Sequence, residues 1–197
     1  MGEFRSDIDR LRGLAILLVV VLHSVALSKD TDIGADMHTA LRGATWLFVF
    51  IAGFLLAHLR DRYTYGGYLL SKLRTVICPY LFLTSLALLL GVAVDQPATL
   101  SDLARVYLLG FPAFGPYWFI PMIALFYLAF PFYRTLCNYP RTLLLTAGAF
   151  VIVSIAFGRP GFDAGPIGNF AYFQSAYIAG LAWRVHEERI NKALPSL

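Results

Sequence analysis

One histidine stands inside the first apolar run of the chain, and an arginine precedes it at a helical spacing. The two are Arg12 and His23, and Asp9 lies just before them. At about 3.6 residues per turn, Arg12 and His23 lie on almost the same helix face, about 16 Å apart along the axis, with Asp9 within roughly 40°. Ionisable groups at membrane depth are costly and usually face the bundle interior. The alternative is a core histidine that bonds a neighbouring hydroxyl.

This stripe places an anion, a cation and a more deeply buried imidazole on one helix face. Imidazole titrates near neutral pH, so His23 could take a proton as a general base or act as a nucleophile. A guanidinium suits phosphate recognition. A donor with a phosphate-rich head and a long thin arm would therefore fit, with its phosphates at Arg12 and its thioester at His23. Asp9 either orients Arg12 or simply caps the helix at the membrane interface.

The composition indicates that membrane helices position these residues. The chain has 197 residues, of which 58% are hydrophobic and 14% are charged. An ordinary soluble chain is about 45–50% apolar and about 25% charged. The net charge of +4 comes without a basic patch of interleaved polar residues, which argues against nucleic-acid binding.

Six apolar runs have the length and flanks of transmembrane helices. Each is near the short end of the ~17–25 residues that cross the hydrocarbon layer, and Tyr or Trp stands at several ends. We therefore predict an all-α, polytopic transmembrane bundle. The runs are Leu11–Leu27, Gly43–Leu59, Val76–Val94, Tyr117–Tyr133, Thr142–Phe157 and Gly168–Trp183.

The distribution of Lys and Arg predicts that both ends of the chain lie in the cytoplasm. We expect the protein in the inner (plasma) membrane of the cell. With the N-terminus inside, twelve of the sixteen fall in inner loops, and the other four are Lys29, Arg42, Arg105 and Arg159. We expect a single transmembrane domain over residues 1–197, with 184–197 as a cytoplasmic tail or loop stub.

Shorter features complete the expected architecture. Residues 100–109, in the longest outer connection, could form a short helix at the outer surface. Four glycines, Gly13, Gly53, Gly91 and Gly180, are expected to permit close helix contacts.

The remaining histidines and the cysteines are not spaced as metal ligands, and we predict no metal site. His38, His58 and His186 lie in loops or at helix ends, where we expect them to be solvated.

The opening segment resembles the signature of the acyltransferase-3 family of membrane enzymes. The family has Leu-Asp-x-Leu-Arg-Gly-x-Ala followed by an apolar helix and a histidine. This chain has Ile8-Asp9-Arg10-Leu11-Arg12-Gly13-Leu14-Ala15 and then His23, with ten residues between Arg12 and His23 as in the family.

Three further stretches are similar to family motifs in the same order along the chain, so the resemblance covers nearly all of it. Phe48–Leu55 is similar to Phe-x-Ser-Gly-Phe, with Ala52 in place of the common Ser. Lys72–Tyr80 resembles the basic stretch before Pro-Tyr, although an Arg-x-x-Arg pair becomes Lys72 and Thr75. Tyr117–Pro121 resembles Leu-Trp-Phe-Leu. Family members usually have about ten spanning helices, so we expect a fragment or a truncated reading frame.

The resemblance implies acyl transfer, commonly of acetyl from acetyl-CoA, to hydroxyls of cell-envelope polysaccharides or lipid-linked sugars. His23 would be the base, or alternatively a transient acyl carrier, and Arg12 would bind donor phosphate or hold the charge of the site. Acyl-CoA would be a substrate, with no permanently bound cofactor, and the partners would be membrane lipid and a carbohydrate acceptor, without nucleic acid.

Four further residues are candidates with a simpler alternative each. Lys72 and Arg74 could bind donor phosphates, although positive-inside anchoring alone explains them. Tyr117 and Trp118 could line the acceptor path, although interfacial belt residues look the same.

Two other functions are compatible with the sequence. A transporter or export component of the inner membrane could use His23 as a proton relay, although the inverted repeats typical of transporters are not apparent. A non-catalytic membrane fragment that packs with a partner is the second alternative.

Overall fold

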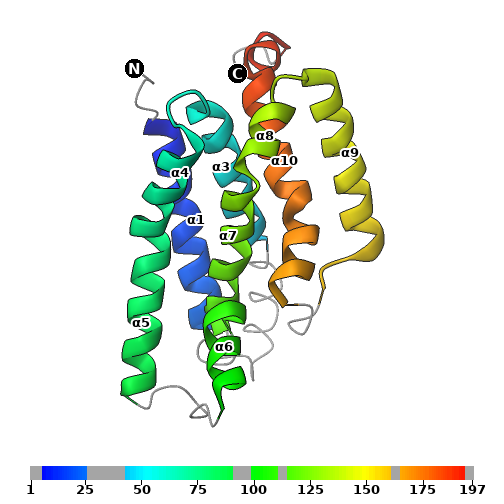
Figure 1. Cartoon of the computed structure of the whole chain (residues 1–197). Helices are drawn as coiled ribbons and strands as arrows, with labels where there is room; N and C mark the ends of the chain where they lie inside the picture. Colours follow the sequence, from blue (N-terminus) through cyan, green and yellow to red (C-terminus); the bar gives the residue numbers. More distant parts are fainter. Residues whose placement is uncertain (1–5, 26–42, 91–98, 111–114, 161–164, 194–197) are drawn as a thin grey trace. The chain divides into compact units, whose positions relative to one another are not determined.

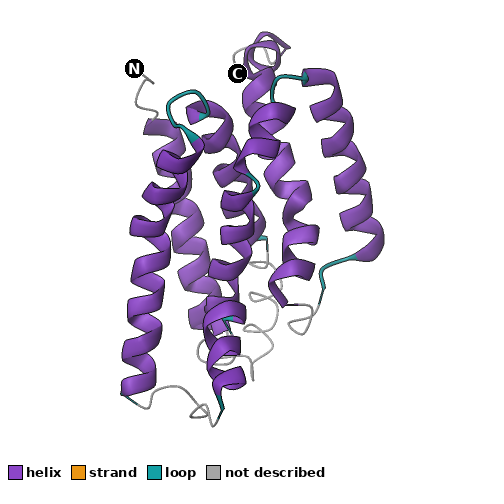
Figure 2. Ribbon diagram, viewed as in Figure 1, coloured by secondary structure: helices purple, strands orange, loops and turns teal. Residues whose placement is uncertain are grey.

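The computed structural model describes residues 6–25, 43–90, 99–110, 115–160 and 165–193. These residues form helices joined by turns, with no strand among them (Figures 1 and 2), which confirms the predicted all-α class. The helices are α1 (Ser6–Val25), α3 (Ala44–Leu59), α4 (Tyr65–Lys72), the π-helical turn η2 (Leu73–Ile77), α5 (Cys78–Leu89), α6 (Leu100–Leu109), the 3-10 turn η3 (Gly115–Trp118), α7 (Phe119–Leu128), α8 (Phe130–Leu136), α9 (Pro140–Phe157) and α10 (Gly165–Ala193).

The chain divides into two compact units. Unit 1 comprises Met1–Arg62, Arg134–Ile155 and Phe173–Leu197, and unit 2 comprises Tyr63–Tyr133 and Ala156–Tyr172. Each unit is described by itself below.

In unit 1, α1 lies beside α3 (Figure 1). The contact is apolar: Ile8 and Ala15 of α1 are buried with Ile51 and Phe54 of α3. Ile8 and Ala15 are seven residues apart, so they lie on one stripe of the helix. This packing fixes which face of α1 is turned toward the rest of unit 1.

Two glycines let α3 and α10 approach at backbone distance. A Cβ added at Gly53 would overlap the carbonyl oxygen of Tyr177, and a Cβ added at Gly180 would overlap that of Phe50. The close contacts predicted at Gly53 and Gly180 are therefore confirmed. The prediction for Gly13 was wrong, because a Cβ there meets nothing within 4 Å. Gly91 lies outside the described residues.

In unit 2, α4, η2 and α5 form one helical segment, Tyr65–Leu89, of 25 residues. The segment begins earlier than the predicted start at Val76. Thr64 caps it, and its Oγ1 accepts a hydrogen bond from the N–H of Gly67 at 3.3 Å. The apolar run did not indicate this start, because the helix begins with a polar cap and two glycines, which lie outside the run. Lys72 and Arg74 consequently lie within the helix.

The predicted span Tyr117–Tyr133 is a bent pair, α7 and α8, with an angle of 58° between them. Pro131 accounts for the bend, since it has no N–H to donate to the carbonyl of Tyr127. Next to this break, the hydroxyl of Tyr65 donates to the carbonyl oxygen of Leu128 at 3.0 Å. The side chain thereby satisfies a carbonyl beside the interruption of the helix.

The short helix predicted over residues 100–109 is present as α6. Thr99 and Asp102 form a capping box: the hydroxyl of Thr99 accepts from the N–H of Asp102, whose carboxylate accepts from the N–H of Thr99. Gly110 ends the helix in the left-handed region, with φ of 68°. A Cβ at Gly110 would also overlap the backbone of Tyr117, so a glycine is required on two grounds.

By length and composition, two described helices could cross a membrane, Tyr65–Leu89 and Pro140–Phe157, or three if the bent α7–α8 pair is one span. The predicted count of six spans is not confirmed. Helix α1 carries Asp9, Arg10 and Arg12, and α3 has only 16 residues.

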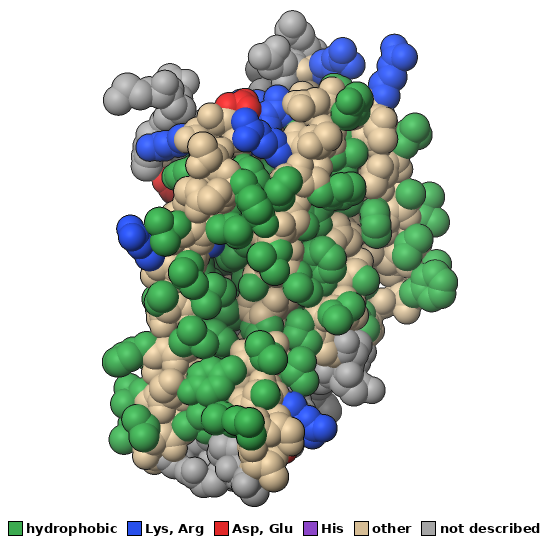
Figure 3. Space-filling view, viewed as in Figure 1, with side chains coloured by type: hydrophobic (Ala, Val, Ile, Leu, Met, Phe, Trp, Pro, Cys, Tyr) green, Lys and Arg blue, Asp and Glu red, His purple; other side chains and the backbone are tan. Residues whose placement is uncertain are grey.

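Large apolar side chains cover the outward faces of the two long helices. On α5 they include Phe82 and Leu89, 67% and 84% exposed, and on α9 Leu145 and Ile155, 76% and 78% exposed. Figure 3 shows hydrophobic side chains along both helices. A water-facing helix would carry polar side chains there, so these faces fit contact with lipid.

Candidate functional site

Arg12 and His23 both belong to the continuous helix α1, as the sequence predicted. At 100° per residue, Arg12 lies about 40° from Ile8 and about 60° from Ala15, the residues buried against α3. Position 23 falls about 20° from position 12 by the same geometry. The stripe therefore flanks the packed face of α1. The placement of the His23 imidazole itself lies outside what the structure describes.

Arg12 and Asp9 form an ion pair one turn apart. Nη1 of Arg12 lies 3.3 Å from Oδ1 of Asp9, and their side chains are 50% and 45% exposed. Such a half-exposed pair contributes little to stability, below about 1 kcal/mol. It does restrict where the guanidinium points, which is the contact that an orienting role for Asp9 requires.

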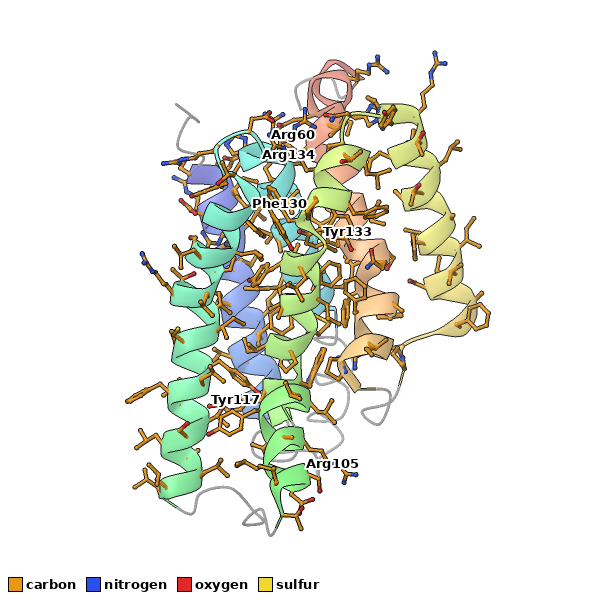
Figure 4. The ribbon with its side chains drawn as sticks, viewed as in Figure 1. Arg60, Arg105, Tyr117, Phe130, Tyr133 and Arg134 are labelled. Carbon is orange, nitrogen blue, oxygen red and sulfur yellow. The ribbon has the colours of Figure 1, made fainter. Side chains whose placement is uncertain are left out.

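A second set of arginines gathers at one end of unit 1, where α3 and α8 end. Nε of Arg60 lies 3.4 Å from Oδ2 of Asp61, and Nη2 of Arg134 lies 3.7 Å from Oδ1 of the same carboxylate. Figure 4 shows Arg60 and Arg134 as neighbours. From the sequence, both are predicted only as inner-loop charges, because their shared contact with Asp61 depends on how the helices pack.

His58 is half-buried and has a protein partner. Nε of Arg184 donates to Nδ1 of His58 at 3.2 Å, while Nη1 of Arg184 pairs with Glu187 at 3.2 Å. A guanidinium only donates, so Nδ1 of His58 is the acceptor in this bond. His186 is also bonded, with Nε2 3.2 Å from the carbonyl oxygen of Pro140. His38 lies outside the described residues.

Lys72 and Arg74 stand where α4 passes into the π-helical turn η2, in unit 2. The Lys72 ammonium lies 5.4 Å from the ring centroids of both Tyr68 and Tyr127. Arg74 is exposed. The two basic residues predicted for donor binding are thus adjacent in the chain but differently surrounded.

Tyr117 and Trp118 are half-buried in η3, also in unit 2. The ring of Tyr117 meets that of Tyr80 edge to face at 5.5 Å, and the Arg159 guanidinium lies 5.5 Å from the Trp118 ring. The sequence indicated these two aromatics for the acceptor path but not Arg159, which follows Trp118 by 41 residues and lies just after α9.

Comparison with known proteins decides the family. Residues 5–197 match the model of the acyltransferase-3 family, described as an acyltransferase domain. No curated protein and no solved structure matches the chain.

The chain belongs to the acyltransferase-3 family.

The match and the apolar helices together make this protein a membrane acyltransferase in general terms. The family was suspected from the motif around Arg12 and His23, and that suspicion is confirmed. The roles of Asp9, Arg12 and His23, of Lys72 and Arg74, and of Tyr117 and Trp118 stay predictions.

Cys137 is a poor nucleophile for this acyltransferase. It is buried in unit 1, just after α8. Burial raises the pKa of its thiol above the usual range, and the nearby Arg60 only partly opposes this effect. The thiol is therefore protonated near neutral pH, whereas a thiolate would be needed to accept an acyl group.

Among the described residues, no group of three or more His, Cys, Asp or Glu could hold a metal ion.

Proposed function

We propose that this acyltransferase moves an acetyl group from acetyl-CoA to a hydroxyl of a cell-envelope carbohydrate or lipid-linked sugar. The observation that carries the proposal is the placement of Arg12 and His23 on one side of a continuous helix, with Arg12 held by Asp9. Family membership supports acyl transfer in general, and the helix geometry supports a donor that is long enough to bridge the two positions.

In the proposed reaction, His23 takes the proton of the acceptor hydroxyl as its oxygen attacks the thioester carbonyl. The tetrahedral intermediate then collapses, the carbon–sulfur bond breaks, and CoA leaves as a thiolate that receives the proton from the imidazolium. The products are the acetyl ester and free CoA. General base catalysis of this kind contributes typically 10²–10⁴-fold. In the second version, His23 attacks the thioester first and CoA leaves as a thiolate. The acceptor hydroxyl then attacks the acyl-imidazole, the carbon–nitrogen bond breaks, and the acceptor proton passes to the CoA thiolate.

Arg12 would bind a phosphate of the donor near the cytoplasmic surface, with Lys72 and Arg74 as further phosphate ligands. Tyr117 and Trp118 would line the acceptor path. This assignment requires the N-terminus and the C-terminus in the cytoplasm of a cell with an inner membrane, as the Lys and Arg distribution predicts.

The test is label transfer in membranes that contain the protein. Acetyl-CoA labelled in the acetyl group is incubated with isolated envelope glycans, and the labelled ester is counted. We expect label with the wild type, background with His23→Ala, and wild-type label with the control His186→Ala. Equal label from wild type and His23→Ala would remove His23 from the reaction, and no label in any glycan fraction would contradict the proposed substrates.

The same membranes address the transporter alternative. A proton relay at His23 predicts a His23-dependent pH change across the membrane that needs no acetyl-CoA. The proposed acyltransferase predicts none.

A further inference from the structure

The Lys72 ammonium lies close to two tyrosine rings that meet each other edge to face. Its Nζ is 5.4 Å from the centroid of Tyr68, one turn back in α4, and 5.4 Å from the centroid of Tyr127 in α7. A cation within about 6 Å of an aromatic ring is attracted by the ring's negative face. Two rings at this distance therefore both attract the ammonium.

The rings are themselves fixed by packing within unit 2. Tyr68 is buried and stacks on Phe130 with centroids 4.4 Å apart, and it meets Tyr127 edge to face at 5.9 Å. Tyr65 stacks on the same Phe130 at 6.2 Å. Phe130 begins α8, directly after the bend (Figure 4). The rings that contact Lys72 are thus anchored on both sides of the helix break.

The backbone changes its winding directly after Lys72. The π-helical turn η2 starts at Leu73, and Thr75 bonds its hydroxyl to the carbonyl of Ser71 at 2.9 Å. A π-helical turn changes the register between the residues before and after it, and such turns occur frequently at functional sites. Here it lets Lys72 face α7 independently of the helix face that α5 presents.

Membrane anchoring alone does not account for this geometry. An anchoring lysine extends its stem and places its ammonium in water. Lys72 instead is half-buried and its ammonium faces Tyr68 and Tyr127. Aromatic rings also differ from a carboxylate, because they attract a cation without placing a negative charge beside it.

We propose that Tyr68 and Tyr127 are positioning residues that hold the Lys72 ammonium where it receives a phosphate oxygen of acetyl-CoA. This inference rests on the proposed function, since it names how one cation of the donor site is placed. It assigns no chemistry to the tyrosine hydroxyls, so the rings alone matter.

The kinetic test compares ring-keeping and ring-removing variants in membranes. Tyr127→Leu is expected to raise KM for acetyl-CoA by roughly three- to tenfold, as the loss of a cation–π contact predicts, with kcat within about twofold. Tyr127→Phe and Tyr68→Phe keep the rings and are expected to keep the wild-type KM. Tyr139→Leu, an exposed tyrosine of unit 1, is the matched control.

A second readout does not depend on turnover. The chain has three lysines, Lys29, Lys72 and Lys192, so amine labelling of Lys72 can be followed by mass spectrometry. We expect free CoA to protect Lys72 from an amine-reactive reagent in the wild type and in Tyr127→Phe, and to protect it less in Tyr127→Leu.

The outcomes separate this inference from the proposed function. Wild-type transfer with an unchanged KM in Tyr127→Leu would overturn the positioning role and leave the function intact. A fall in kcat without a change in KM or in protection would show ordinary structural damage and would also overturn it. Absence of both transfer and protection in the wild type would overturn the function and this inference with it.

Discussion

At the scale of single residues, the hydroxyl of Tyr80 ties α5 to the end of α6. It lies 3.2 Å and 3.0 Å from the carbonyl oxygens of Val106 and Tyr107. The carbonyl of Val106 also accepts a hydrogen bond from the N–H of Gly110 at 3.2 Å. The carbonyl of Tyr107 lies in the last turn of α6, where carbonyls often lack an intrahelical donor. The hydroxyl of Tyr80 therefore chiefly replaces solvation of the Tyr107 carbonyl.

We predict that Tyr80→Phe lowers the free energy of unfolding by about 0.5–1.5 kcal/mol, because it removes the hydroxyl that donates to the Tyr107 carbonyl and one of two donors to the Val106 carbonyl. Thermal or denaturant unfolding of the purified protein in detergent measures the change. Tyr139→Phe is the matched control, since Tyr139 is 60% exposed. An equal effect from both variants would contradict the role assigned to Tyr80.

Local pairs could be predicted from the sequence at this scale, whereas distant pairs could not. Asp9 and Arg12 are three residues apart, and helical spacing brings them together before any packing is considered. His58 and Arg184 meet only because α3 and α10 pack side by side. The ring contacts of Lys72 depend in the same way on α7, so the sequence named Lys72 without its neighbours.

At the scale of helices, the close crossing of α3 and α10 requires glycine at two positions. Gly53 and Gly180 each face a backbone carbonyl of the other helix. Small residues at helix interfaces in membranes allow this approach, and close packing there replaces the hydrophobic driving force that water would supply.

We predict that Gly53→Ala and Gly180→Ala each lower the free energy of unfolding by about 1–3 kcal/mol, the usual cost of overpacking, or more if the helices cannot shift. Gly13→Ala is the control, because a Cβ there meets open space and alanine favours the helix by up to about 1 kcal/mol. Unfolding in detergent compares the three variants. Tolerance of alanine at Gly53 and Gly180 would contradict the described crossing.

Helix positions followed from the sequence more closely than helix ends and bends did. Long apolar runs predicted α3 and α9 nearly to the residue, since uninterrupted apolar composition marks their extent. The start of α4 was missed because Tyr65, Gly66 and Gly67 are poor helix signals and only the Thr64 cap marks the boundary. Pro131 is the sequence signal for the bend between α7 and α8, although a proline alone does not predict the angle of the bend.

At the scale of the whole molecule, the exposed apolar faces of α5 and α9 and the distribution of charge lead to one expected orientation. Inner loops would carry most of the Lys and Arg residues, including Arg62, whereas α6 would lie on the outer side.

Thiol labelling of single-cysteine variants tests this orientation, because it shows on which side of the membrane each residue lies. With Cys78 and Cys137 replaced by serine, Arg62→Cys would be protected from a membrane-impermeant thiol reagent added to intact spheroplasts, and Ser101→Cys would react. Both would react after permeabilisation. The opposite pattern would reverse the orientation and would place Arg12 on the wrong side for a cytoplasmic donor.

The central claim is a division of labour along α1: Arg12 binds the donor and His23 acts on the thioester reaction. Steady-state kinetics with acetyl-CoA as the varied substrate test it most directly. We predict that Arg12→Ala raises KM by roughly tenfold or more with little change in kcat, as loss of a charge-assisted bond implies. His23→Ala should lower kcat by at least about a hundredfold while CoA binding stays within a few-fold of wild type. A His23→Ala variant that keeps the wild-type kcat would contradict the account.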